Sequence, residues 1–399
     1  MTKNIGINIL LYPELKTQDK ATDILNRISW GLINYNKRIK IYYISELSLI
    51  YEQISKTYSS VNTGNYLLDN SNIKLEKINL NWLLSETVKE FDLILVWETS
   101  KLSEIVEKNS RTIIIDPYSE HSTEADNIAS LQYSLLNEDE KAELIANNTE
   151  IFQNLYKRFK NKTIASLFLT GPSLDNVLQK KISSNGIKMV CNSIVKNQLL
   201  MEKIDPDILM FSDPAYHFGP SKYSESFRRY IHECFQKFKD LICIVPERYL
   251  PLISSYYDPC YRDHFLGIPV FDQNEFNFPR PNKLFVRYTG NILTQFMIPV
   301  ASALTKVVEI FGADGRAPTD NGFWNHSAKS QMHDLESSIY KTHPSLARDT
   351  NVKEYYKNHC EMLENILRFG EQKGIKYYSK TKSFIPALNN RQKIEIPGN

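Results

Sequence analysis

The tetrapeptide Gly171-Pro172-Ser173-Leu174 has the residue types of a phosphate-binding turn. It follows an apolar run at residues 164–169 and precedes a helix-like stretch. Glycine lets the backbone approach a ligand closely, proline fits the first helical turn, and the free N–H groups of a helix start favour an anion beside the serine hydroxyl. The alternative is an ordinary strand-to-helix turn, so the tetrapeptide has to be weighed together with the motifs that follow it.

Four more polar motifs follow in order, three of them at the end of a predicted strand. They are Cys191-Asn192, Ser212-Asp213-Pro214, Arg287-Tyr288-Thr289-Gly290-Asn291, and Gly312-Ala313-Asp314 with Tyr340 and His343 downstream. Open α/β sheets bind ligands beyond the carboxyl ends of their strands. The order therefore predicts one ligand site in the second half of the chain.

This ordered set resembles the bacterial sialyltransferases of the lipooligosaccharide type, which use a CMP-activated sugar acid. The resemblance spans roughly residues 164–385. It implies a sialyltransferase-like domain in which Gly171, Pro172 and Ser173 bind the nucleotide and Asn192 contacts the donor. The other residues that it assigns to the donor site are Arg287, Thr289, Gly290, Gly312, Asp314 and Tyr340. The family's Tyr-x-x-His element carries its catalytic histidine, which corresponds here to His343.

Two departures from that family change the expected mechanism. The family has Asn-Pro after its third strand where this chain has Asp213-Pro214, and Arg316 stands in place of an expected tyrosine. An arginine can still hold a phosphate through a bidentate fork. With residues 1–155 in front, the layout is similar to that of the bacterial Kdo transferases of capsule and O-antigen assembly. Those enzymes also use a CMP-activated sugar acid, and they retain configuration.

The aspartate at position 213 adds a chemical possibility that asparagine lacks. A retaining transfer by double displacement needs a carboxylate nucleophile on the sugar face. We hypothesise that Asp213 attacks the anomeric carbon of a CMP-Kdo-like donor. The alternatives are that Asp213 caps the following segment or binds a donor hydroxyl.

Two further groups are candidates for acid–base catalysis. Histidine titrates near neutrality, so His343 could act on the acceptor proton or the leaving phosphate; the alternative is a surface histidine before Pro344. His326 and His333 are the fallback candidates. Glu98 follows the apolar run at residues 91–97 and could serve as an acceptor-side base, with a role near a helix cap as its alternative. Asp116 has the same status as Glu98.

Neither a metal nor an organic cofactor is expected besides the CMP-activated donor. Asp205-Pro206-Asp207 has the Asp-x-Asp spacing that holds a metal on a diphosphate in some glycosyltransferases, but Asp-Pro-Asp is also common turn chemistry. A CMP donor has one phosphate and a carboxylate, for which basic and backbone donors suffice. The aromatic residues that could stack on a sugar or on cytosine are Tyr256, Tyr257, Phe323 and Trp324.

Apolar runs that alternate with helical segments predict an α/β fold with two Rossmann-like domains in series, a GT-B-like layout. The predicted domains are an N-terminal one at 1–155 on the acceptor side and a CMP-sugar-binding catalytic one at 156–399. Strands are predicted at residues 5–12, 39–44, 91–97, 112–115, 164–169, 188–191, 208–211, 241–245, 284–286, 307–311 and 376–379. The main helices are predicted at residues 21–34, 137–160, 224–238, 291–304 and 352–373.

The composition is that of a soluble globular protein, with 42% hydrophobic and 24% charged residues and a net charge of +2. This charge gives no general attraction to nucleic acid. The sequence shows no secretion signal or membrane span, and its five cysteines are scattered, so we expect a cytoplasmic protein with reduced thiols. Basic residues near the C-terminus are expected to form a solvated helix face; peripheral contact with the anionic inner-membrane surface is the alternative.

These features predict a transferase that moves a Kdo-type 3-deoxy sugar acid from a CMP donor to a bacterial surface glycan. The acceptor is expected to be an oligosaccharide or a lipid-linked glycan of lipopolysaccharide or capsule. One alternative is an inverting sialyltransferase that uses CMP-sialic acid with His343 as base. Others are a non-catalytic nucleotide-binding module and a pyrophosphokinase-like relative with a similar Gly-Pro-Ser turn.

Overall fold

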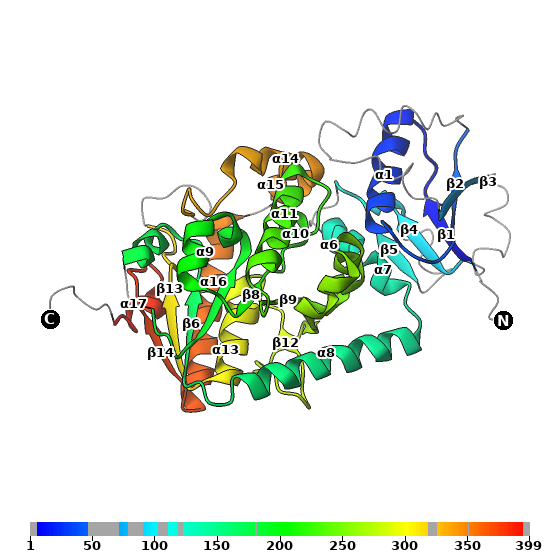
Figure 1. Ribbon diagram of the computed structural model, residues 1–399. Helices are drawn as coiled ribbons and strands as arrows, with labels where there is room; N and C mark the ends of the chain where they lie inside the picture. The colour runs from blue at the N-terminus through cyan, green and yellow to red at the C-terminus, as the bar shows by residue number, and fades with distance from the viewer. Residues whose placement is uncertain are drawn as a thin grey trace.

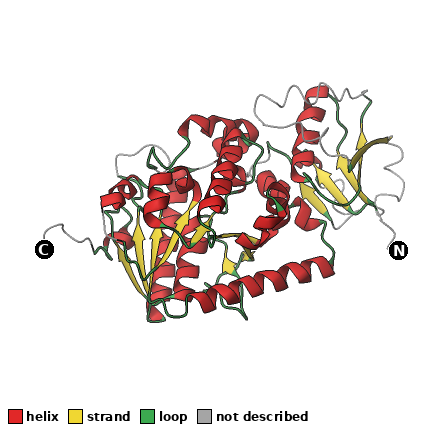
Figure 2. Ribbon diagram, viewed as in Figure 1, coloured by secondary structure: helices red, strands yellow, loops and turns green. Residues whose placement is uncertain are grey.

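The described residues form two large parallel β-sheets and a two-stranded one, with helices around them, which confirms the predicted α/β class (Figure 2). The computed structural model describes residues 6–46, 72–78, 91–102, 111–118, 123–179, 182–317, 325–349 and 351–393. Within these ranges, no helix is both long enough and apolar enough to cross a membrane.

The smaller sheet comes from the first part of the chain and has the strand order β3-β2-β1-β4-β5, with all neighbours parallel. Its strands are β1 (Ile7–Tyr12), β2 (Ile39–Ile44), β3 (Ile73–Ile78), β4 (Leu93–Val96) and β5 (Thr112–Ile114). Alternate residues of β4 enter two different hydrophobic clusters, because both faces of a parallel sheet are covered. The strand order reverses between β1 and β4, so the switch point of this sheet lies there.

The larger sheet has the order β10-β9-β8-β7-β6-β13-β14, again with all neighbours parallel. Its strands are β6 (Ile164–Phe168), β7 (Ile187–Cys191), β8 (Ile208–Met210), β9 (Ile242–Pro246), β10 (Phe265–Ile268), β13 (Val307–Phe311) and β14 (Lys376–Ser379). The chain leaves β6 toward β7 on one side, and β13 lies on the other. The switch point of this sheet is therefore between β6 and β13.

Helices cover both faces of the larger sheet (Figures 1 and 2). Leu167 of β6 packs in a cluster with side chains of α8, α13 and α16, whereas the next residue, Phe168, packs in a cluster with α9 and α11. The helices are α1 (Gln18–Gly31), α6 (Thr123–Ala129), α7 (Leu131–Ser134), α8 (Glu138–Arg158), α9 (Gln198–Ile204), α10 (Pro214–His217), α11 (Lys222–Lys237), α12 (Leu250–Tyr256), α13 (Ile298–Leu304), α14 (Glu336–Thr342), α15 (Pro344–Asp349), α16 (Val352–Gln372) and α17 (Pro386–Asn389).

The long helix α8 runs from the smaller sheet to the larger one (Figure 1). It begins with a capping box, in which the Asn137 side chain accepts from Glu140 N and the Glu140 side chain accepts from Asn137 N. Its apolar residues Phe152 and Leu155 are buried against the larger sheet. The predicted connecting helix is thus confirmed, and the predicted domain boundary after residue 155 falls inside it.

Two strand predictions for the second half need correction. The strand predicted at residues 284–286 overlaps β12 (Val286–Arg287) only at Val286, and within the described residues β12 pairs with β11 (Val270–Phe271) in a separate two-stranded sheet. The sequence reading also missed β10, which forms one edge of the larger sheet. The Arg287 motif therefore does not follow a strand of the larger sheet.

Candidate functional site

The turns that follow β6 and β13 meet at the switch point of the larger sheet. Gly171 donates its N–H to Gly312 O at 2.9 Å. A Cβ atom on Gly171 would overlap the Asp314 carboxylate and lie 2.5 Å from Gly312 O. Gly312 has φ +71°, and a Cβ there would lie 2.6 Å from Leu169 O. Both glycines are therefore required for the two turns to touch.

The Asp314 carboxylate accepts a hydrogen bond from the turn that the sequence predicted to bind a phosphate. Its Oδ2 accepts the N–H of Ser173 at 2.9 Å, and Pro172 has no N–H to offer. Burial raises the pKa of Asp314, and the hydrogen bonds from Ser173 oppose this rise. In this structure the protein's own carboxylate therefore occupies one N–H of the turn that was predicted to bind an anion.

Asn192 stands at the carboxyl end of β7, next to the Gly171 turn. It has φ +50°, a left-handed conformation that is uncommon for residues other than glycine. Its Oδ1 atom is buried and has no hydrogen-bond partner among the described residues. A buried acceptor without a donor costs about 1–3 kcal/mol, and backbone strain of this kind gathers at binding sites. Both observations favour a role for Asn192 in ligand binding.

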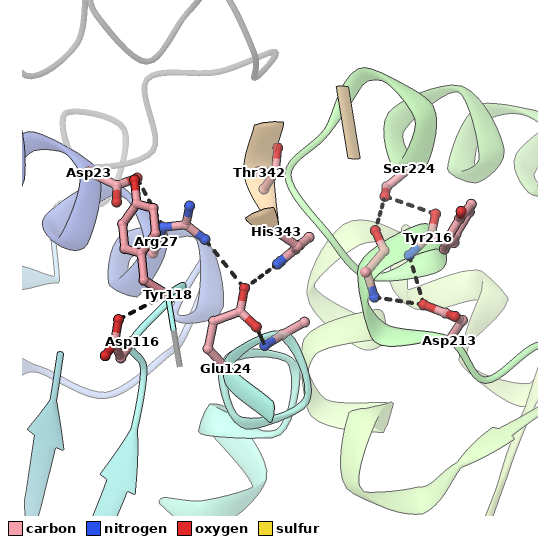
Figure 3. A network of polar contacts seen from close by, with 12 residues as sticks. Asp23, Arg27, Asp116, Tyr118, Glu124, Asp213, Tyr216, Ser224, Thr342 and His343 are labelled. Carbon is pink, nitrogen blue, oxygen red and sulfur yellow. Dashed lines mark hydrogen bonds and ion pairs between the residues drawn. The ribbon is translucent and has the colours of Figure 1, made fainter. Parts of the chain in front are cut away.

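Asp213 follows β8 and caps the short helix α10. One carboxylate oxygen, Oδ1, accepts from Ala215 N at 2.9 Å and from Tyr216 N at 3.1 Å (Figure 3). The other oxygen, Oδ2, has no hydrogen-bond partner in the part of the chain that the structure describes. Burial raises the pKa of Asp213, while the two N–H groups and His343 oppose the rise. Asp213 thus caps the following helix, as one of the alternatives held. The cap fixes Oδ1 and leaves Oδ2 available for contact with a ligand.

His217, at the end of the same helix, is a buried neutral histidine. Its Nδ1 accepts the N–H of Asp213 at 3.1 Å, which requires an unprotonated nitrogen. Burial lowers the pKa of His217 to about 3. The ring therefore holds the backbone that carries Asp213.

This low pKa predicts a pH-dependent effect of a His217→Asn substitution. Below the unfolded pKa of about 6.5, the unfolded chain binds a proton that the folded chain cannot bind, so acid favours unfolding of the wild type. Relative to the wild type, the variant should gain about 2 kcal/mol in free energy of unfolding between pH 7 and pH 5. Urea denaturation of both proteins at the two pH values measures this change. A wild-type-to-variant difference that stays constant with pH would contradict the assigned neutral state.

His343 ends α14 and is buried, with 2% of its surface exposed, so the surface alternative is wrong. Its Nδ1 lies 2.5 Å from Oε1 of Glu124, a fully buried residue of α6 (Figure 3). Arg27 Nη1 lies 3.8 Å from the same oxygen. His343 Nε2 is buried without a partner among the described residues, and a Cβ on Gly219 would lie 3.2 Å from it. The contact between Glu124 and His343 joins the two halves of the chain.

Sequence reasoning missed Glu124. Its partner lies 219 positions away, and a single glutamate at the start of a short helix gives no signal of its own. Tyr340, the other residue of the predicted Tyr-x-x-His element, lies on α14 and is 39% exposed. Its hydroxyl is 3.4 Å from that of Tyr216, so it contacts α10 rather than the histidine.

The Arg287 motif is held by the long helix α16 rather than by the larger sheet. Thr289 Oγ1 pairs with Thr294 Oγ1 at 2.8 Å, and Gly290, at φ +68°, accepts a hydrogen bond from Tyr355 OH at 2.7 Å. Arg287 donates to Asn274 O at 2.7 Å and stacks on Phe276.

Tyr356, the next residue of α16, contacts Arg316, which was predicted to hold the donor phosphate. Arg316 N donates to Tyr356 OH at 3.3 Å, and its guanidinium lies over the Tyr356 ring. Two successive tyrosines of α16 thus hold the Gly290 turn and Arg316, a connection that the sequence did not reveal.

Glu98 has only local contacts. It lies beyond β4, at the switch point of the smaller sheet, and its Oε1 accepts from Ser100 Oγ at 3.0 Å. Asp116 accepts from the N–H and hydroxyl of Thr99. Glu98 has the predicted position at a strand end, but no hydrogen bond links it to Asp213 or His343.

The other candidates are placed as follows. His326 pairs with Thr170 Oγ1 at 2.8 Å, and burial lowers its pKa to about 4, whereas His333 is exposed beside Glu336. Asp205 and Asp207 lie at the amino end of β8, opposite the site, and contact Lys188, while Asp207 also contacts Arg158.

Among the aromatic candidates, Tyr256 and Tyr257 pack beside Arg228 and Phe235. Phe323 and Trp324 lie outside the described residues.

Comparison with known proteins gives two structural neighbours. No protein-family model and no curated protein matches the chain. One neighbour is the sialyltransferase CstII from Campylobacter jejuni, solved with the substrate analogue CMP-3FNeuAc; the similarity has 13% identity and a TM-score of 0.29, and covers 57% of this chain and 88% of that one. The other is the monofunctional α-2,3-sialyltransferase Cst-I from the same organism, with 14% identity, a TM-score of 0.30, and coverage of 59% and 82%.

Proposed function

We propose that this protein is a glycosyltransferase that transfers a sugar acid from a CMP-activated donor. The observation that carries the proposal is a row of polar groups at the carboxyl ends of four neighbouring strands, in the sheet order β8-β7-β6-β13. The row contains Asp213, Asn192, the Gly171 turn and the Gly312–Asp314 turn. It lies at the switch point, where open parallel sheets bind nucleotides and related ligands. Composition and periodicity alone would not require four motifs to meet there.

Asn192 is proposed to contact the donor, with the nucleotide over the Gly171 and Gly312 turns. Its unpartnered amide oxygen can accept a hydrogen bond from an amino or hydroxyl group of the donor. Since Asp314 holds the N–H of Ser173, the phosphate is proposed to displace this carboxylate or to bind beside it. Arg287, Thr289, Arg316 and Tyr340 remain proposed donor residues on the α14 and α16 side.

Asp213 is proposed as the nucleophile of a retaining transfer of a Kdo-type sugar acid. Its Oδ2 would attack the anomeric carbon as the bond to the CMP phosphate breaks, giving a glycosyl ester and free CMP. An acceptor hydroxyl would then attack the same carbon, release the carboxylate and give its proton to a base. His343 and Glu98 are the proposed candidates for that base. The acceptor is proposed to be a bacterial surface glycan, approached from the side of the smaller sheet.

An inverting sialyltransferase with His343 as base is the second candidate. The Glu124 contact to Nδ1 fixes the ring, as expected for an oriented base. However, Nε2 is buried against the Gly219 loop, whereas Asp213 keeps a free oxygen. This difference favours Asp213 as the group that meets the sugar.

The proposal predicts that CMP stabilises the protein against heat, whereas UDP or ATP with magnesium does not. At 100 times its Kd, a ligand stabilises the folded state by about 2.7 kcal/mol. An Asn192→Gly substitution keeps a backbone that tolerates positive φ but removes the amide, so it should weaken the effect of CMP. Asn34→Gly is the matched control, because Asn34 has φ +51° outside the site. Stabilisation by ATP and magnesium alone would support the kinase-like alternative instead.

A further inference from the structure

Arg248 is a fixed arginine at the same edge of the larger sheet, and the sequence motifs do not include it. It lies just beyond β9, the neighbour of β8. Its Nη2 donates to Asp126 Oδ1 at 2.7 Å, and the Tyr249 hydroxyl donates to the same oxygen. Asp126 belongs to α6, so a residue of the first half of the chain holds the guanidinium in place.

The other two nitrogens of the guanidinium have no hydrogen-bond partner among the described residues, although the group lies over the Tyr249 ring. Its Nε is buried and unpaired within the described ranges, and Nη1 has no hydrogen bond to any residue that the structure describes. The side chain is 39% exposed. A buried guanidinium donor without an acceptor is costly, and a ligand oxygen would satisfy it. The group is thus a cation that is anchored on one side and open on the other.

Arg248 and Asp213 follow the carboxyl ends of two neighbouring strands, β9 and β8. Helix α6 packs against α10, the helix that Asp213 caps. The charge of Asp126 acts to raise the pKa of Asp213. Tyr288, which is 53% exposed, interacts electrostatically with both Arg248 and Asp213. Arg248, held by Asp126 of α6, and Asp213, at the start of α10, therefore lie on the two sides of the contact between α6 and α10, beyond the carboxyl ends of β9 and β8.

We infer that Arg248, held by Asp126 and Tyr249, binds the carboxylate of the sugar acid. This inference rests on the proposed function, because it takes the donor to be a sugar acid. A guanidinium presents a planar fork that matches a carboxylate in two hydrogen bonds. In Kdo and sialic acids, the carboxylate is attached to the anomeric carbon that Asp213 would attack. Arg248 would then select sugar acids over neutral sugars and hold that carbon in front of Oδ2.

The test compares the affinities for CMP and for a CMP-sugar acid, measured by calorimetry with CMP, CMP-Kdo and CMP-sialic acid. The wild type is expected to bind one of the two donors more tightly than CMP. Arg248→Met should lower the affinity for that donor by about 10- to 100-fold and leave the affinity for CMP unchanged. Arg248→Lys keeps the charge but loses the planar fork, so its affinity for the donor should lie between those of the wild type and Arg248→Met. Arg229→Met changes an exposed arginine of α11 and is the matched control.

Each contrary result has a distinct meaning. If the wild type does not bind CMP, the proposed function is wrong, and the inference is overturned with it. If the wild type binds the donor and Arg248→Met keeps the full preference over CMP, only the inference is overturned. An unchanged donor affinity with a raised acceptor KM also overturns it, because the arginine would then bind an acceptor anion. The melting temperature of each variant shows that the folded protein is being compared.

Discussion

Replacing Asp213 by asparagine is expected to slow sugar transfer by at least about 10⁴-fold. The amide cannot form the glycosyl ester that double displacement requires. Asparagine caps helices as well as aspartate does, so Ala215 N and Tyr216 N keep an acceptor and the fold is preserved. CMP release in the presence of donor and acceptor measures the rate, and unchanged stabilisation by CMP shows that the donor site is intact.

Intact-protein mass spectrometry examines the same step without an acceptor. After incubation with CMP-Kdo or CMP-sialic acid, the wild type should gain the mass of one sugar residue, and Asp213→Asn should not. Asp207→Asn is the matched control, since Asp207 precedes β8 and lies at the opposite edge of the sheet. Transfer at the wild-type rate by Asp213→Asn would eliminate the nucleophile role. Acceptor-dependent CMP release without an adduct would support the inverting alternative.

Replacing Glu124 by glutamine is expected to lower the free energy of unfolding by about 3 kcal/mol. The carboxylate is fully buried between His343 at 2.5 Å and Arg27 at 3.8 Å, so glutamine removes the negative charge that pairs with Arg27 and places an NH2 group beside buried donors. Arg27 keeps its contact with Asp23, which limits the loss. Urea denaturation at neutral pH measures the change.

Glu140→Gln is the control for this prediction. Glu140 pairs with Lys37 at 2.7 Å, but both side chains are about a third exposed (28% and 34%), so the substitution should cost less than about 1 kcal/mol. Glutamine also preserves the capping box of α8. Equal costs for the two substitutions would mean that the Glu124 contact contributes no more than a surface pair.

The sequence predicts the central strands of both sheets well, whereas at the sheet edges it predicts β5 and β14 but misses β3 and β10. β1, β4, β6 and β13 are apolar runs with polar ends, and all were predicted. β3 has the sequence IKLEKI and was missed, because this edge strand has few buried side chains and its charged residues hide the pattern. β12 was predicted as a strand but assigned to the wrong sheet, because periodicity does not state the partner of a strand.

The candidate site was predicted where its residues follow strands, and was missed where it depends on tertiary contacts. The carboxyl ends of parallel strands meet at one edge, so the encounter of Gly171 and Gly312 could be expected. The bond from Ser173 N to Asp314 depends on the path of a loop, which no local rule gives. The contacts of Glu124 and Arg248 join helices far apart in the chain, and only packing brings them together.

The contact between Glu124 and His343 has a consequence for the order of synthesis. Ribosomes add about 5–20 residues per second, so the 219 positions between the two residues correspond to about 10–45 s. During that interval the smaller sheet is complete and α10 can already pack against α6, but the surface of α6 around the Glu124 carboxylate lacks its histidine partner. We therefore expect nascent chains that stall before residue 343 to leave this surface open to chaperones and proteases.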